Sequence, residues 1–277
     1  MTNLPSVPAL SIFFMAVTLL ISILLFFGLF LYLRKKMDLK MTPFWIGAAV
    51  FISFALILQP IVHNIILNPQ ADGTHRLSAH LVAYGIFACL SAGIFEETGR
   101  FAAFKFLRKK FTGIRTAISY GIGHGGGEAL IIAGLAAVGN LSFSIMLNAG
   151  MADLLGEAAD VAATAAILAE SSPLVFLLGG LERIAAVALH MALSLLVWHS
   201  VNTKGKLWFY PLSIGLHALF NVIAVLYQFG VITNLFVVEA LIFVEAAAIV
   251  YVVRRLLKGL RQTDRRPSPE HGHYPTE

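Results

Sequence analysis

The stretch GIFEETGRFAAFKFLRKK, residues 93–110, joins an apolar segment that contains Glu96, Glu97 and Arg100 to a dense basic cluster. Only 13% of the chain is charged and 58% is hydrophobic, so carboxylates inside an apolar run stand out. An apolar run that ends in Lys and Arg is typical of a helix that crosses a membrane and stops at its cytoplasmic side. The stretch therefore predicts a membrane-spanning helix that carries polar residues within it.

The composition of all 277 residues supports the same class of protein. The mean hydropathy is +0.81, and several apolar runs approach or exceed the roughly 20 residues that a helix needs to cross a bilayer. The net charge of +5 arises from basic clusters beside hydrophobic segments, so it indicates membrane lipids and no nucleic-acid partner. The single cysteine, Cys89, excludes an intrachain disulfide and a multi-cysteine metal site.

We expect an all-α, polytopic bundle of about seven to eight transmembrane helices. Seven spans are predicted, at about residues 8–33, 43–68, 80–107, 116–139, 173–200, 207–229 and 232–256. The Lys and Arg clusters, at 34–40, 105–115, 204–206 and 254–266, then all fall on one side of the membrane. This predicts a multi-pass protein of a bacterial cell membrane with its N-terminus outside and its C-terminus in the cytoplasm.

The chain is expected to form one bundle domain over residues 1–260, followed by a polar, disordered cytoplasmic tail at 261–277. Residues 141–172 contain acidic residues but no Lys or Arg. A helix there would place Asp153, Glu157 and Asp160 on one face. This pattern favours an amphipathic helix on the outer surface or a re-entrant pair, and two further spans are the alternative.

Ionisable side chains at membrane depth are costly and therefore mark functional candidates. Four predicted spans carry them: Glu96, Glu97 and Arg100; His124 and Glu128; Glu182, Arg183 and His190; and His217, with Asn221 beside it. Three pairs, Glu96/Arg100, His124/Glu128 and His217/Asn221, are spaced i, i+4. Each pair therefore shares a helix face, and we expect the four polar faces to meet.

The depths of the polar residues in the predicted spans agree. Glu96, His124 and His190 each lie nine or ten residues from the basic end of their helix, as does His217. At 1.5 Å per residue, all four are roughly 13–15 Å from the cytoplasmic boundary. We therefore expect one site, although a single membrane histidine is more often simply hydrogen-bonded across helices.

A carboxylate and several imidazoles at one level can activate a water molecule for peptide hydrolysis. Zinc is one route, with His124, His190 and His217 as ligands and Glu96 as general base. Direct polarisation of the water by Glu96 and a histidine is the metal-free route. Asn221 can hydrogen-bond a developing oxyanion. The glycines of GHGGG, residues 123–127, either allow close helix packing or break the helix beside a cavity.

The ordered set E-E-x-x-R, Tyr120 four residues before His124, a later histidine and H-x-x-x-N resembles the type II CAAX protease and bacteriocin-processing (CPBP) superfamily. The GHGGGE and ER…H elements more closely resemble its YhfC-type intramembrane metalloproteases, over roughly residues 80–225. The resemblance implies a helical bundle whose polar cavity opens toward the cytoplasm. It implies Glu96 as the carboxylate that activates water, assisted by His124, with His217 and Asn221 as oxyanion or metal-site groups.

The pattern also departs from the prenyl proteases, which show E-E-x-x-x-R, whereas Arg100 comes one residue earlier. A membrane protein or peptide is therefore the expected substrate, without a prenyl group being implied. The rival classes are a non-catalytic scaffold that binds partner helices, as other members of the superfamily are thought to do, and a proton-coupled transporter. The transporter is disfavoured because the chain shows no internal repeat.

The remaining charged residues are expected to support the site. Glu97 is expected to pair with Arg100 or Arg183, and Glu182 and Arg183 each with a partner on another helix. Glu128 is expected either to orient an imidazole as its acceptor or to bind a metal directly.

Overall fold

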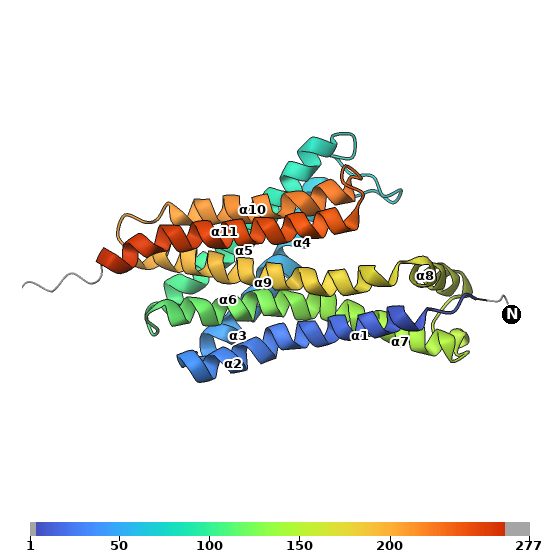
Figure 1. The fold of residues 1–277 in the computed structure, drawn as a ribbon. Helices are drawn as coiled ribbons and strands as arrows, with labels where there is room; N and C mark the ends of the chain where they lie inside the picture. Colours follow the sequence, from blue (N-terminus) through green and yellow to red (C-terminus); the bar gives the residue numbers. More distant parts are fainter. Residues whose placement is uncertain (1–3, 264–277) are drawn as a thin grey trace, which may run out of the picture.

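A computed structural model describes residues 4–263 and shows a bundle of long helices, as Figure 1 illustrates. Within these residues, seven helical segments are long and apolar enough to cross a membrane: Ala9–Met37, Met41–Leu67, Leu81–Leu107, Ile114–Asn148, Pro173–Asn202, Phe209–Gln228 and Leu235–Lys258. The all-α class and the seven predicted spans are thus confirmed. The last helix continues to Thr263, and the rest of the predicted tail lies outside the described residues.

Several spans are composite. The elements are α1 (Ala9–Ile23) and α2 (Leu29–Met37); α3 (Met41–Val50) and α4 (Gln59–Leu67); α5 (Leu81–Leu107); α6 (Ile114–Glu128) and α7 (Leu135–Asn148); α8 (Ala158–Glu170); α9 (Pro173–Asn202); α10 (Phe209–Gln228); and α11 (Leu235–Thr263). Short π-helical segments join the two helices within the first, second and fourth spans, at Leu24–Gly28, Phe51–Leu58 and Ala129–Gly134. Such segments widen the helix locally and commonly lie near functional sites.

Helix α9 is the inner helix of the bundle. In Figure 1 it runs between a group formed by α1, α3 and α6 and a group formed by α5, α10 and α11. Its most apolar stretch is 67% buried, whereas no other span exceeds 33%. Its small residues Ala185, Ala186 and Ala192 lie in an apolar cluster with side chains of α10 and α11. Because the other spans leave most of their apolar surface uncovered, that surface is available to lipid.

The glycine run of α6 allows close packing and does not break the helix, which continues through it to Glu128. A Cβ atom on Gly125 would lie 2.9 Å from the Cβ of His190 on α9, and one on Gly126 would lie 2.9 Å from the Cα of Phe26. On the facing helix α3, a Cβ on Gly47 would lie 2.9 Å from the backbone nitrogen of His124. Glycine thus brings α6 against three neighbours and sets the position of His124.

Residues 141–172 form neither two spans nor a re-entrant pair. The fourth span runs on to Asn148, beyond its predicted end, and α8 has 13 residues, about 20 Å of helix, which is too short to cross a bilayer. Figure 1 shows α8 across the end of the bundle near the start of α1. Its buried face packs Val161, Ala165 and Leu168 against the chain around Val7 and Leu147.

The prediction that Asp153, Glu157 and Asp160 share one helical face is only partly confirmed. Helix α8 begins at Ala158, so Asp160 lies in its first turn while Asp153 and Glu157 precede it. The chain turns at Gly156, whose φ of +131° favours glycine and separates the acids into two elements.

Candidate active site

The polar side chains of four helices meet inside the bundle. Glu96, Glu97 and Arg100 come from α5, His124 from α6, His190 from α9 and His217 from α10. All six are buried, and the exposed fraction of none exceeds 7%. The structure therefore encloses the polar faces that the i, i+4 spacings placed together, and it keeps them away from lipid.

Glu96 lies at the centre of this group. Its Oε2 atom is 2.9 Å from Nε2 of His124 and 4.0 Å from Nδ1 of His190. Its Oε1 atom is 3.8 Å from Nε2 of His217. One carboxylate thus has an imidazole from each of three other helices within 4.0 Å.

Two of the three imidazoles have a second carboxylate partner. His217 donates from Nδ1 to Oε1 of Glu97 at 2.9 Å, which leaves its Nε2 directed at Glu96. His190 places Nε2 at 2.6 Å from Oε2 of Glu128, which leaves its Nδ1 facing Glu96. A carboxylate on the far nitrogen fixes the tautomer and orientation of a histidine, as it does for metal-bound histidines.

Charge around the group is balanced by two arginines. Arg100 pairs with Glu97 while both are fully buried, and it donates from Nη2 to Nδ1 of His190 at 2.9 Å. Arg183 donates to Oε1 of Glu128 on α6 at 2.9 Å. Arg183 therefore has the partner on another helix that we expected.

The expectation for Glu182 was wrong, because its partner is its neighbour Arg183 on the same helix. Arg183 thus stands between two carboxylates and ties α9 to α6 beside His190.

A cavity of about 200 Å³ adjoins the group. Among the side chains that line it are Glu96, Glu128, Arg183, His190, His217 and Asn221. Asn221 lies one helical turn from His217 on the same wall of α10. The cavity therefore has carboxylate, imidazole and amide groups on its surface.

The cavity lies on one side of the histidines. On α9 its lining begins at Glu182 and ends at His190, and on α10 it begins at His217 and ends at Ala224. Both stretches extend from the histidine level toward the end of the bundle that is farther from the basic clusters. The predicted opening toward the cytoplasm stays a prediction, and the space itself lies on the opposite side of the histidines.

Comparison with known proteins places this chain in a family. Residues 21–242 match the family described as YhfC intramembrane metalloprotease. The chain belongs to the YhfC family. It is also 37% identical over 247 residues to the "Uncharacterized membrane protein YhfC" of Bacillus subtilis (strain 168), a match that covers 87% of this chain and 94% of that protein. The expected YhfC resemblance is thus confirmed, and the wider CPBP membership stays a prediction.

The family match covers all four helices that carry the polar group. Within it, Glu96, His124 and His190 each offer one ligand atom, and these atoms lie within 4.8 Å of one another. Two imidazoles and a carboxylate form a ligand set that catalytic zinc sites use. The donor chemistry and the Glu128 partner of His190 therefore fit a zinc ion after small side-chain movements.

This grouping differs from the predicted set of three histidines, because Glu96 takes the place of His217. The binding of a metal at His190 would also compete with a hydrogen bond. Nδ1 of His190 accepts the hydrogen bond from Arg100, and one nitrogen lone pair cannot serve both a guanidinium and a metal. Loading of the site therefore requires Arg100 to move away from His190.

Aromatic rings that the predicted site did not include surround His124. The ring of Tyr120 stacks at 5.8 Å between centroids, and the ring of Phe51 lies edge-on at 5.5 Å. Tyr120 was visible as part of a motif, whereas Phe51 is one aromatic residue in an apolar span and gave no signal. Helix α11, outside the region of expected similarity, adds Ile242 to the cavity wall.

Proposed function

We propose that this protein is an intramembrane endopeptidase that hydrolyses a peptide bond of a membrane-protein or membrane-peptide substrate at the Glu96 group. A single observation carries the proposal: Glu96 is buried among three histidines from three other helices, at 2.9, 3.8 and 4.0 Å, beside a cavity inside the bundle. The YhfC family name supports the same class of enzyme. Burying so many ionisable groups is costly, which favours a functional role.

In this proposal Glu96, His124 and His190 would hold a zinc ion. Zinc supplies Lewis-acid chemistry, which polarises a carbonyl group and acidifies water. Glu128 holds the His190 ring through Nε2, so Nδ1 is the nitrogen that would hold the ion. The rings of Tyr120 and Phe51 limit the access of bulk water to His124.

His217 acts as the proton carrier. Its Nδ1 is held by Glu97, and its Nε2 faces Glu96 across 3.8 Å. Nε2 can therefore accept a proton from the attacking water and return it to the leaving amine, while Glu97 stabilises the charged imidazolium. The amide of Asn221, on the same wall, donates to the carbonyl oxygen as negative charge develops there.

The metal-free route is the second candidate, and the Arg100 contact favours it. With Arg100 on Nδ1 of His190, that histidine is not free to bind a metal. Glu96 then activates the water itself, and His124, at 2.9 Å, assists it. The two routes use the same residues but differ in their need for zinc.

Elemental analysis of the detergent-purified protein separates the two routes. The zinc route predicts near-stoichiometric zinc in the wild type and in His217→Ala, and its loss in His124→Ala and His190→Ala. Zinc that is absent from a folded, active wild type leaves the metal-free route. A matched cleavage assay on a transmembrane peptide should lose activity in Glu96→Gln. A folded protein that cleaves no such peptide would instead support the scaffold or the transporter.

A further inference from the structure

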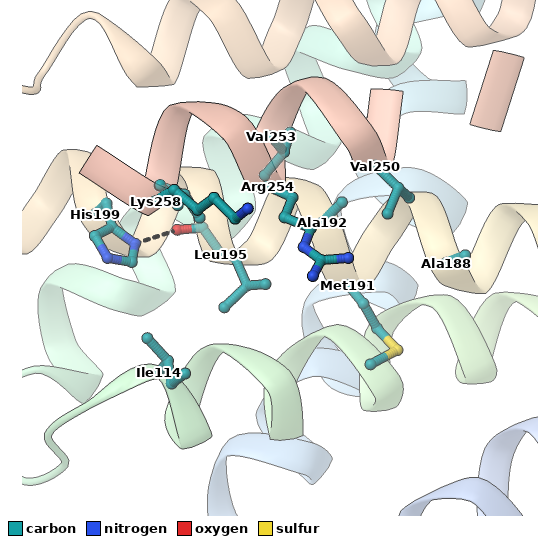
Figure 2. Close-up of a pocket in the computed structure, with 11 residues that line it drawn as sticks. Ile114, Ala188, Met191, Ala192, Leu195, His199, Val250, Val253, Arg254 and Lys258 are labelled. Carbon is teal, nitrogen blue, oxygen red and sulfur yellow. Dashed lines mark hydrogen bonds between the residues drawn. The ribbon is translucent and has the colours of Figure 1, made fainter. Parts of the chain in front are cut away.

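A second cleft, near the basic end of the bundle, lies outside the candidate active site. It has a volume of about 490 Å³ and lies between α6, α9 and α11, as Figure 2 shows. On α9 its wall follows one helical face through Ala188, Met191, Leu195 and His199. We call this cleft the α9–α11 groove. Its size falls in the range of ligand-binding pockets, about 300–1,000 Å³.

The chemistry of the α9–α11 groove changes along its length. Its inner part is apolar, with Ala188, Met191 and Val250, whereas its other end carries Arg254 and Lys258 of α11. Figure 2 shows Arg254 extending from α11 toward Met191, and Lys258 lying beside Leu195 and His199. Within residues 4–263 no acidic side chain pairs with either cation.

The length of the groove matches one leaflet of a bilayer. Ala188 and His199 are eleven positions apart on α9, which corresponds to about 16 Å along the helix. Half of a hydrocarbon core about 30 Å thick is about 15 Å. Lys258, beside His199, therefore lies where phosphate groups begin when the apolar part lies beside acyl chains, and Arg254 lies one helical turn deeper on α11.

We propose that the α9–α11 groove binds one anionic phospholipid, with an acyl chain along Ala188, Met191 and Val250 and the phosphate at Arg254 and Lys258. Basic pockets between transmembrane helices are a known mode of anionic headgroup recognition. His199 donates from Nδ1 to the carbonyl of Leu195 at 2.8 Å, so its Nε2 is left for the headgroup. A transmembrane substrate helix would need a groove about twice as long, so the lipid fits better.

The test measures stabilisation of the full-length protein in a neutral detergent, because a ligand that binds only the folded state raises the unfolding midpoint. The probes are phosphatidylglycerol, phosphatidylcholine with the same acyl chains, and inorganic phosphate. We expect phosphatidylglycerol alone to raise the midpoint at low concentration. A similar rise with phosphatidylcholine or with inorganic phosphate would overturn the proposal, since the site would then recognise any lipid or only a free anion.

Matched variants locate the site. Arg254→Gln/Lys258→Gln should weaken phosphatidylglycerol binding about 25-fold, at about fivefold for each cation. Arg255→Gln/Lys35→Gln removes the same charge outside the α9–α11 groove and should leave the affinity within about twofold of wild type. Equal losses in the two variants would show a diffuse surface attraction and refute a defined site. Peptide cleavage and zinc content are separate readouts, so this test does not depend on the proposed protease.

Discussion

Arg100 and His190 are joined across the bundle by a hydrogen bond of 2.9 Å from Nη2 to Nδ1, and Nδ1 is the His190 nitrogen that faces Glu96. Arg100 is also the buried partner of Glu97, which in turn orients His217. A single guanidinium therefore links two of the three histidines around Glu96. Its removal has consequences for stability and for metal binding that can be measured separately.

The first prediction concerns stability. Arg100→Met should lower the free energy of unfolding by about 3–5 kcal/mol, because it leaves the fully buried Glu97 without its cation. Glu97→Gln/Arg100→Met should recover most of that loss, since it buries no uncompensated charge. Thermal unfolding in detergent measures both variants. Asp38→Asn breaks the exposed Asp38–Lys40 pair and should leave the midpoint unchanged. A double variant as unstable as the single one would show that Glu97 does not depend on Arg100.

The second prediction concerns metal binding. Glu97→Gln/Arg100→Met frees Nδ1 of His190 and leaves the net charge beside the proposed zinc site unchanged, because it removes one cation and one anion. Zinc affinity should therefore rise by about tenfold or more, because zinc no longer has to displace the charged hydrogen-bond donor Arg100 from Nδ1. Competition with a chromophoric chelator measures the change. An unaltered or weaker affinity would indicate that His190 is not a ligand, and adding His190→Ala to the double variant provides the control.

The sequence predicted the fold and the composition of the polar group because both depend on hydrophobic length and helix spacing. Apolar runs and basic clusters placed seven spans, and i, i+4 spacing placed Glu96, His124 and His217 on inward faces. The sequence could not show whether Arg100 or Arg183 pairs with Glu97, because the pairing depends on the rotation and register of the helices. For the same reason spacing could not assign Glu128 to His190 or place Phe51 against His124.

The third prediction tests the close packing of α6. Gly125→Ala would place a methyl group 2.9 Å from the Cβ of His190, which should cost about 1–3 kcal/mol and displace that imidazole. We expect a lower unfolding midpoint and loss of zinc. Gly139→Ala is the matched control on the same continuous span, since nothing lies within 4 Å of its added methyl group. It should be neutral or stabilise the helix by up to about 1 kcal/mol. If the two variants changed the unfolding midpoint and the zinc content equally, Gly125 would not be required for close packing against His190.

The fourth prediction concerns Asn221, which lines the cavity one turn from His217. Removing one donor to a developing oxyanion typically lowers kcat by about 10²–10³. Asn221→Ala should therefore reduce kcat for a cleaved transmembrane peptide by about that factor, while zinc content and the unfolding midpoint stay as in wild type. A change in KM alone would instead make Asn221 a substrate-binding residue.

The fifth prediction fixes the orientation and, with it, the side from which the cavity is reached. Because Cys89 is the single cysteine of the chain, Cys89→Ala provides a background without thiols. On it, Ala71→Cys lies in an exposed loop at the end away from the basic clusters, and Thr112→Cys lies in an exposed loop among them. The positive-inside rule predicts that a membrane-impermeant maleimide labels Ala71→Cys in intact cells and labels Thr112→Cys only after permeabilisation. Since the cavity extends from the histidines toward the Ala71 side, this result would place it in the outer half of the membrane. The reverse labelling would place the cavity in the cytoplasmic half, as the family resemblance implies.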